Sequence, residues 1–143
     1  MKVGNVLLAS LAGTTAMTLF SYVTSRKKNK NFREPDVLGK MVYRVVPEIE
    51  KPLSTIAGWV LHGGAGLFFA AVYESLLKDT KVKPTVPYGR LTDGVNGAVA
   101  LLIWKATFRL HPDPPQIHFE DFYKHLLLAH VIYGTVTLCV LKK

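Results

Sequence analysis

The chain has 143 residues, of which 49% are hydrophobic, and a formal net charge of +8 at pH 7. That length suits one domain covering residues 1–143, and the single cysteine, Cys139, excludes an intrachain disulfide. The basic residues flank long apolar stretches and are not interleaved with aromatic ones, which argues against nucleic-acid binding and favours contact with anionic lipid.

Four apolar stretches organise the sequence. They cover residues 3–23, 53–77, 91–110 and 122–141, and the first contains no charged side chain. A helix needs ~20 mostly apolar residues to cross the hydrocarbon core of a bilayer, and each stretch has that length. We therefore predict an all-α polytopic membrane protein, a bundle of four transmembrane helices. Two alternatives are a soluble helical bundle, which would need a polar face on each helix, and a cleaved N-terminal signal peptide.

A basic cluster follows the first stretch. It comprises Arg26, Lys27, Lys28, Lys30 and Arg33. Lysine and arginine beside a membrane span favour the cytoplasmic face and contact lipid headgroups. The cluster therefore predicts a cytoplasmic first loop, with both chain termini on the opposite side of the membrane.

Residues 36–46 have the pattern of a short amphipathic helix. Asp36 caps its start after Pro35, and Pro47 ends it. The apolar positions that fall on one side of this helix are Val37, Leu38, Met41, Val42 and Val45. The pattern predicts either an interfacial helix lying on the membrane or an amphipathic helix packed on the other helices.

The second stretch carries a stripe of residues spaced by four, which share one face of a helix. The stripe comprises Gly58, His62, Gly66, Ala70 and Glu74. Small residues let a neighbouring helix approach closely in lipid, and we assign the same packing role to Gly63 and Gly134. The stripe therefore predicts that its histidine faces the interior of the bundle.

Polar side chains inside the apolar stretches form the candidate site. They are His62, Glu74, Asp93, Asn96, Lys105, His125 and His130. The second and fourth stretches run in the same direction, so His62 and His130 come to a matched depth of roughly 12 to 14 Å below one face, at ~1.5 Å per residue. Ionisable groups in a membrane usually face the protein interior and mark function.

Each of these groups also has a structural interpretation. The two histidines would hydrogen-bond across helices, and Glu74 would pair with Lys78 or Arg90 near the end of its span. Asp93 would cap a helix, and Lys105 would extend its ammonium group to the membrane interface.

Two kinds of chemistry stay open for the interior residues. His62 and His130 on parallel helices match the two axial ligands of a b-type haem. The same histidines, together with Glu74 and Asp93, would line a path for protons or ions. No phosphate-binding loop and no nucleophile–base set is legible, so we predict no catalytic residues and no resident cofactor.

The loop before the last stretch holds residues of metal-ligand type. His111, Asp113 and His118 lie close together in the sequence, followed by Glu120 and Asp121. Intervening prolines give these residues no defined spacing, so the cluster is a weak candidate and we predict no metal site.

Several motifs resemble the YagU-like family of small bacterial inner-membrane proteins. They are "AGTTAMTLF", "GWVLHGGAGLFFAAVYE", "YGRLTDGVNGAVALLIW" and "HLLLAHVIYGTV", and the residues that carry most of the likeness are Gly58, His62, Gly66, Phe69 and Tyr73. The resemblance implies a polytopic protein of the inner membrane and supplies no catalytic residues. The basic segment 26–33 has no counterpart in the pattern.

Three functional hypotheses follow. The first is a non-enzymatic accessory or scaffold component that packs against other membrane helices, as a homo-oligomer or as a subunit of a larger assembly. The second is a transporter or channel for protons, ions or small solutes. The third is a membrane redox subunit that holds haem between its two histidines.

Overall fold

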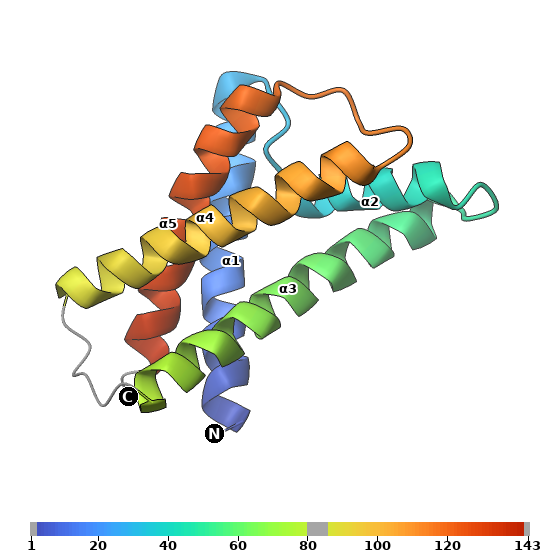
Figure 1. The fold of residues 1–143 in the computed structure, drawn as a ribbon. Coiled ribbons are helices and arrows are strands. Elements are labelled where there is room, and N and C mark those ends of the chain that lie inside the picture. Colours follow the sequence, from blue (N-terminus) through green and yellow to red (C-terminus); the bar gives the residue numbers. More distant parts are fainter. Residues whose placement is uncertain (1–2, 80–85, 142–143) are drawn as a thin grey trace.

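The computed structural model describes residues 3–79 and 86–141. Within these ranges, residues 79 and 86–93 are described by their backbone alone. The described residues form five α-helices (Figure 1). Their bounds are α1 Val3–Lys28, α2 Glu34–Val45, α3 Lys51–Asp79, α4 Val86–Leu110 and α5 Phe119–Leu141. The predicted all-α class is therefore confirmed.

The helices pack as an antiparallel pair with further helices against it. Helix α1 packs against α5, and the two run side by side in opposite directions (Figure 1). Helix α3 packs on α1 and on the short α2, and α4 packs on α5. The loops 29–33 and 111–118 lie at one end of the α1–α5 pair, and the start of α1 and the end of α5 lie at the other end.

Among the described residues, α1, α3 and α5 are long and apolar enough to cross a membrane. The predicted spans 3–23, 53–77 and 122–141 lie within these helices. The predicted span 91–110 lies within α4, in which only residues 94–110 have described side chains, and α4 is not among the three helices that meet this criterion. The structure therefore supports three candidate spans and leaves the role of α4 as a prediction.

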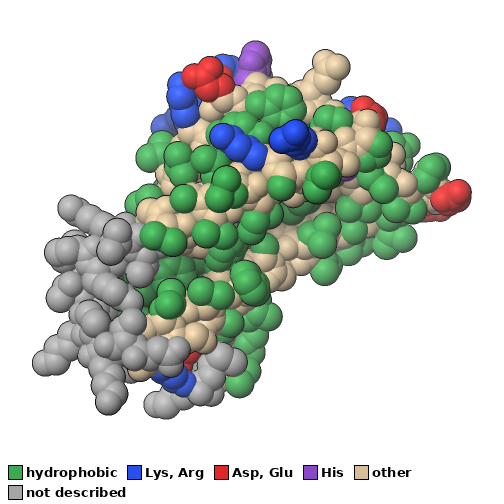
Figure 2. Space-filling model, viewed as in Figure 1, with side chains coloured by type: hydrophobic (Ala, Val, Ile, Leu, Met, Phe, Trp, Pro, Cys, Tyr) green, Lys and Arg blue, Asp and Glu red, His purple; other side chains and the backbone are tan. Residues whose placement is uncertain are grey.

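Large apolar side chains cover the outer surfaces of the long helices. Leu11 of α1, Val60 of α3, Leu102 of α4 and Leu128 of α5 are each 59 to 67% exposed. Figure 2 shows hydrophobic side chains spread over the visible face, with many of the charged side chains toward its ends. A surface of this kind is unfavourable in water and suits contact with lipid or with other apolar helices.

Helix α2 begins at Glu34, two residues before the predicted start at Asp36. Pro35 occupies the first turn, where its missing N–H costs no hydrogen bond. Asp36 is therefore inside the helix and does not cap it; its carboxylate accepts a hydrogen bond from the Tyr22 hydroxyl of α1. The buried residues of α2 include Val37 and Met41. The helix packs on α3, in agreement with the predicted alternative of an amphipathic helix packed on the other helices.

Close approach of α2 to α3 depends on a glycine in each helix. A Cβ atom built on Gly58 would lie 2.3 Å from the carbonyl oxygen of Pro35 and 2.8 Å from the Cα of Gly39. Further toward the C-terminal end of α3, a Cβ on Gly66 would lie 2.1 Å from the hydroxyl oxygen of Thr14 in α1. Backbones can approach to these distances only where no side chain intervenes.

All members of the predicted stripe in α3 are buried: Gly58, His62, Gly66, Ala70 and Glu74. Gly134 is also buried on α5. Gly63 differs, because a Cβ on it would meet no atom within 4 Å. Gly63 therefore packs against no other described helix, because it lies one position off the buried face, and its packing role stays a prediction for contact with a further membrane helix.

Substitution of Gly58 by alanine should lower the free energy of unfolding by about 1–3 kcal/mol, because the new methyl group must push α2 away from α3. The matched variant Gly63→Ala should leave it unchanged or raise it by up to ~1 kcal/mol, since alanine favours helix and the site is open. Unfolding in mixed detergent micelles, followed by circular dichroism, measures both variants. Equal effects of the two substitutions would contradict the described crossing.

Candidate functional site

A row of hydroxyl side chains on α1 faces the interior of the bundle. Thr14, Thr18, Ser21 and Ser25 follow one another at three- or four-residue steps, so they lie on one side of the helix. We call these residues the hydroxyl row. Ser25 sits at the end of the row, where its hydroxyl accepts a hydrogen bond of 2.9 Å from the backbone N–H of Phe32 and fixes the chain as it leaves α1.

Thr18 binds the first predicted histidine. Its hydroxyl lies 2.9 Å from Nε2 of His62, which is only 6% exposed. The indole ring of Trp59, one turn earlier on α3, meets the imidazole edge-on at 6.4 Å between centroids. The contact joins α1 to α3 and gives His62 the interior position expected from the stripe of small residues.

Ser21 joins two further helices to α1. Its hydroxyl donates a hydrogen bond of 2.9 Å to Oε1 of Glu34 on α2. The same oxygen lies 2.8 Å from Nε2 of His125 on α5. Because a hydroxyl has a single proton, donation to the glutamate leaves its lone pair to accept an N–H from the imidazole. We call this arrangement the Glu34–Ser21–His125 chain.

Two aromatic rings enclose the histidine of this chain. The His125 ring is parallel to Phe20 within 6°, with centroids 4.9 Å apart, and stacks on Phe32 from α1's following loop at 4.6 Å. The side chain of His125 is buried on all sides by these rings and its helix neighbours. Its orientation is therefore fixed by packing as well as by the hydrogen bond to Ser21.

Glu34 is the most unusual residue of the interior. The residue is 1% exposed, and its Oε2 atom has no hydrogen-bond partner among the described residues. It lies on α2, outside the apolar spans, and burial raises the pKa of its carboxyl group from 4.5 to about 8. At neutral pH the Glu34 carboxyl group is therefore mainly in its protonated, uncharged form.

A cavity of about 520 Å³ lies between α3 and α4 and is lined by residues from all five helices. Most of its wall is apolar, and its aromatic members are Phe68, Phe69, Trp104 and Tyr133. Leu61, Phe68 and Ile103 line the cavity and are also 49 to 61% exposed on the outer surface. The cavity therefore opens sideways, onto the apolar surface of the molecule.

The polar residues of the cavity wall are Thr14, Glu34, His62, Thr107, His130 and Tyr133. The hydroxyl oxygen of Thr14 and Oε2 of Glu34 are buried without a hydrogen-bond partner in the described structure. Polar atoms enclosed in this way are normally paired, so each unpaired atom calls for an explanation.

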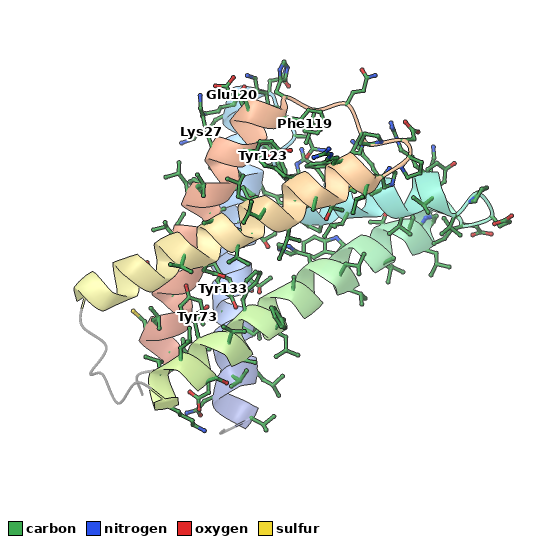
Figure 3. The ribbon with its side chains drawn as sticks, viewed as in Figure 1. Lys27, Tyr73, Phe119, Glu120, Tyr123 and Tyr133 are labelled. Carbon is green, nitrogen blue, oxygen red and sulfur yellow. The ribbon has the colours of Figure 1, made fainter. Side chains whose placement is uncertain are left out.

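His130 has a defined tautomer. Its Nδ1 lies 2.9 Å from the carbonyl oxygen of Leu126, and because a carbonyl only accepts, Nδ1 carries the proton. In the neutral ring Nε2 then holds a free lone pair. One turn on, the Tyr133 hydroxyl donates to the carbonyl oxygen of Gly66 at 2.5 Å, and Figure 3 shows its ring beside Tyr73 of α3.

The two predicted interior histidines therefore share one cavity but form separate contacts. His62 bonds to Thr18, whereas His130 bonds within its own helix and meets Phe69 edge-on at 5.9 Å. An axial haem ligand needs a free ring nitrogen directed at the iron. Nε2 of His130 is a free ring nitrogen in the described structure, whereas Nε2 of His62 is hydrogen-bonded to Thr18.

Glu74, Asn96 and Lys105 are not part of this cavity wall. Glu74 is 9% exposed, and its carboxylate pairs with Lys78 at 3.3 Å, as its structural interpretation required. Asn96 is buried, with Nδ2 unpaired among the described atoms. The side chain of Asp93 lies outside the described residues. The predicted interior position of Lys105 is wrong: the residue is exposed, and its ammonium group lies 5.4 Å from the Tyr123 ring centroid.

The loop candidates serve to attach the loop to α2. His111 donates from Nε2 to the carbonyl oxygen of Met41 at 3.0 Å, and its Nδ1 accepts from the N–H of Asp113. The carboxylate of Asp113 pairs with Arg44 at 2.9 Å. Within the described ranges, neither these residues nor His118 belongs to a group of three or more side chains that could hold a metal ion.

The basic cluster divides into two groups. Arg26 and Lys27 are exposed and available to headgroups, and Lys28 lies over the Phe32 ring at 5.9 Å. Lys30 forms an ion pair with Asp121 of α5, and Arg33 pairs with Asp36 at 3.2 Å while covering the Tyr22 ring. The second group therefore holds the first loop against the protein.

Three residues of the site were not predicted from the sequence. Glu34 precedes a proline at a helix start, where an acidic residue is ordinary, and nothing local indicates its burial. Thr18 and Ser21 lie in a stretch that reads as uniformly apolar. The three- and four-residue spacing of the hydroxyls was the one signal that could have identified their common face.

No protein-family profile matches the chain, and neither a curated protein nor a solved structure matches it.

The free energy of unfolding of the wild type, relative to Glu34→Gln, should fall as pH rises. Between about 4.5 and about 8, the unfolded chain has lost the Glu34 proton and the folded protein retains it. The contribution of this proton to the free energy of unfolding is thus fully present below about pH 4.5. It decreases by up to ~1.4 kcal/mol per pH unit as the pH rises toward about 8. Unfolding of both proteins in mixed micelles between about pH 5 and about pH 8 measures the difference. A difference independent of pH would show that Glu34 is not enclosed.

Proposed function

We propose that this protein is a small, non-enzymatic integral membrane protein that binds a lipophilic molecule in the cavity between α3 and α4. The observation that carries the proposal is a cavity that opens on the apolar surface and ends at buried, unpaired polar atoms. A molecule dissolved in the bilayer would reach this cavity without crossing the aqueous phase.

The size and lining of the cavity fit such a ligand. Its volume of about 520 Å³ falls in the ~300–1,000 Å³ range of small-molecule pockets, which are mostly apolar with few polar groups. The exposed rim residues Leu61, Phe68 and Ile103 would face acyl chains. An apolar tail would therefore be in favourable surroundings both at the mouth and inside.

The polar end of the cavity favours a ligand that also carries a hydrogen-bonding group. Oε2 of Glu34 and Oγ1 of Thr14 lack partners in the described structure. An unpaired polar group enclosed among apolar atoms in a bilayer costs on the order of several kcal/mol. A polar head on the ligand would supply the missing hydrogen bonds. The pairing would also orient the ligand with its tail toward the lipid.

The proposal places the bundle in a bacterial inner membrane with α4 as a fourth span. The exposed basic residues Arg26 and Lys27 support a cytoplasmic position for the loop 29–33. The loop 111–118 lies at the same end of the α1–α5 pair (Figure 1). The position of α2 near this end fits a helix at the interface, and the motifs in α1, α3, α4 and α5 support kinship with the YagU-like family.

An accessory role in a larger assembly is the second candidate function. The observation in its favour is Gly63, which is exposed on α3 with open space around its Cα. A second membrane helix would approach closely at such a position. The cavity wall does not extend to Glu74, so an ion path through the predicted residues has less support than either binding function.

Gly64→Leu should weaken the binding of a neutral lipophilic alcohol, ω-bromoundecanol, by about tenfold or more. Gly64 lines the cavity, and no atom lies within 4 Å of a Cβ built on it, so leucine would fill the cavity without distorting α3. The matched variant Gly63→Leu adds the same side chain outside the cavity wall and should bind like the wild type.

Quenching of Trp104 by the bromine measures this binding, since Trp104 lines the cavity. The substitution Trp59→Phe leaves Trp104 as the sole tryptophan, and Trp104→Phe leaves Trp59, which is 44% exposed and reports on the micelle. Saturable quenching of Trp104 alone supports the proposal. Unsaturable quenching that is equal at both positions would contradict it, and a changed oligomeric mass for Gly63→Leu would favour the accessory role.

A further inference from the structure

We propose that the cavity selects a lipophilic ammonium ion, whose positive charge pairs with the Glu34 carboxylate in exchange for the carboxyl proton. The inference rests on the proposed binding function and names the chemical class of its ligand. It follows from the charge environment of Glu34, the unpaired oxygen on this side chain and the aromatic wall of the cavity.

Glu34 has no positive partner within the described structure, although basic residues are close in sequence. Its neighbour Arg33 pairs with Asp36, and Lys30 pairs with Asp121. The only side chain that hydrogen-bonds to Glu34 in the described residues is Ser21, at Oε1. A buried carboxylate without a counter-charge is strongly destabilised, and a cation held beside it removes that penalty.

The free oxygen of Glu34 belongs to the cavity. Oε2 is buried and unpaired, and the residue is part of the cavity wall. The Ser21 hydroxyl already donates to one oxygen of this carboxylate. An ammonium N–H would donate a charge-assisted hydrogen bond to the other oxygen. The chain Glu34–Ser21–His125 would keep Oε1 in place while Oε2 binds the ligand.

The aromatic residues of the wall also favour a cation. Phe68, Phe69, Trp104 and Tyr133 line the cavity from three helices. The face of an aromatic ring attracts an ammonium group, most strongly where water is excluded. The same rings accept the apolar tail, so a lipophilic amine satisfies both features and an alcohol satisfies only one.

The other titratable groups near Glu34 do not replace it as the anion. His62 and His130 share the cavity wall, and His125 lies across Ser21. The remaining charged or titratable neighbours are Asp36 and Arg33 on or beside α2, Lys28 near His125, Tyr22 on α1 and Tyr133 on α5. The cavity residues of α4 are Ala100, Ile103, Trp104 and Thr107, none of them charged. Among the described residues of the cavity wall, Glu34 is thus the sole acid.

Proton exchange follows from the uncharged state of the empty site. The ammonium ion enters with its N–H bonds intact, the O–H bond of the Glu34 carboxyl breaks, and that proton leaves to the aqueous phase. Burial raises the pKa of Glu34 to about 8. Because binding releases one proton, the affinity for the amine should increase about tenfold for each unit of increasing pH, up to that pKa.

The test compares ω-bromoundecylamine with ω-bromoundecanol, which have the same length and the same bromine atom. Trp104 quenching is recorded in the Trp59→Phe background, which serves as the wild type here, and in the same background with Glu34→Gln or Glu74→Gln, between about pH 6 and about pH 8. Glu74 is a matched control, because it is a buried glutamate that pairs with Lys78 outside the cavity wall. Gel filtration and circular dichroism check that each variant is folded.

The wild type and Glu74→Gln should bind the amine at least tenfold more tightly than the alcohol, with an affinity for the amine that rises with pH. In Glu34→Gln the ratio of the two affinities should fall toward one, and the pH dependence should disappear. If Glu34→Gln does not fold, the pH dependence of amine binding to the wild type tests the inference, and an amine affinity independent of pH would contradict it. Saturable alcohol binding without a preference for the amine would overturn this inference alone, whereas no saturable binding of either compound would overturn the proposed function as well.

Discussion

The hydrogen bonds of the hydroxyl row on α1 are the interaction on which the rest of the interior depends. Apolar helices gain little by leaving lipid for one another, so close packing and interhelical hydrogen bonds decide which faces meet. Thr18 connects α1 to α3, and Ser21 connects it to both α2 and α5. Gly58 lets α3 approach the backbone of α2, and Gly66 leaves room for the Thr14 hydroxyl of α1 against α3.

This way of joining the helices leaves an opening. Helix α3 is held on α1 and α2, whereas α4 is held on α5, and the cavity lies between α3 and α4. The polar groups that bind the helices together therefore also form the end of the cavity. Thr14 and Glu34 belong to the same interior surface as Thr18 and Ser21, but each retains an unpaired oxygen. Under the proposed function, one oxygen of the Glu34 carboxyl group would hold Ser21 and the other would bind the ligand.

The sequence predicted the features that follow from helix periodicity and failed where tertiary contacts decide. The four-residue spacing from Gly58 to Glu74 identified the buried face of α3, because all these residues are on one helix. The position of Glu34 depends on how α2 folds back on α3, which no local pattern encodes. Lys105 lies on a helix whose inner face depends on its contact with α5, so its interior position was predicted wrongly. Gly63 shows the limit of composition, since only its angle around α3 separates it from the packed glycines.

The most direct test of the hydroxyl row is the free energy of unfolding of Thr18→Val compared with that of Thr15→Val. Both replace a hydroxyl by a methyl group on α1, but Thr15 is exposed and Thr18 binds His62. Loss of that partner should cost about 1–3 kcal/mol, and the exposed substitution should change stability by less than about 0.5 kcal/mol. Equal values for the two variants would mean that this hydrogen bond does not hold α3 to α1, and would contradict the account.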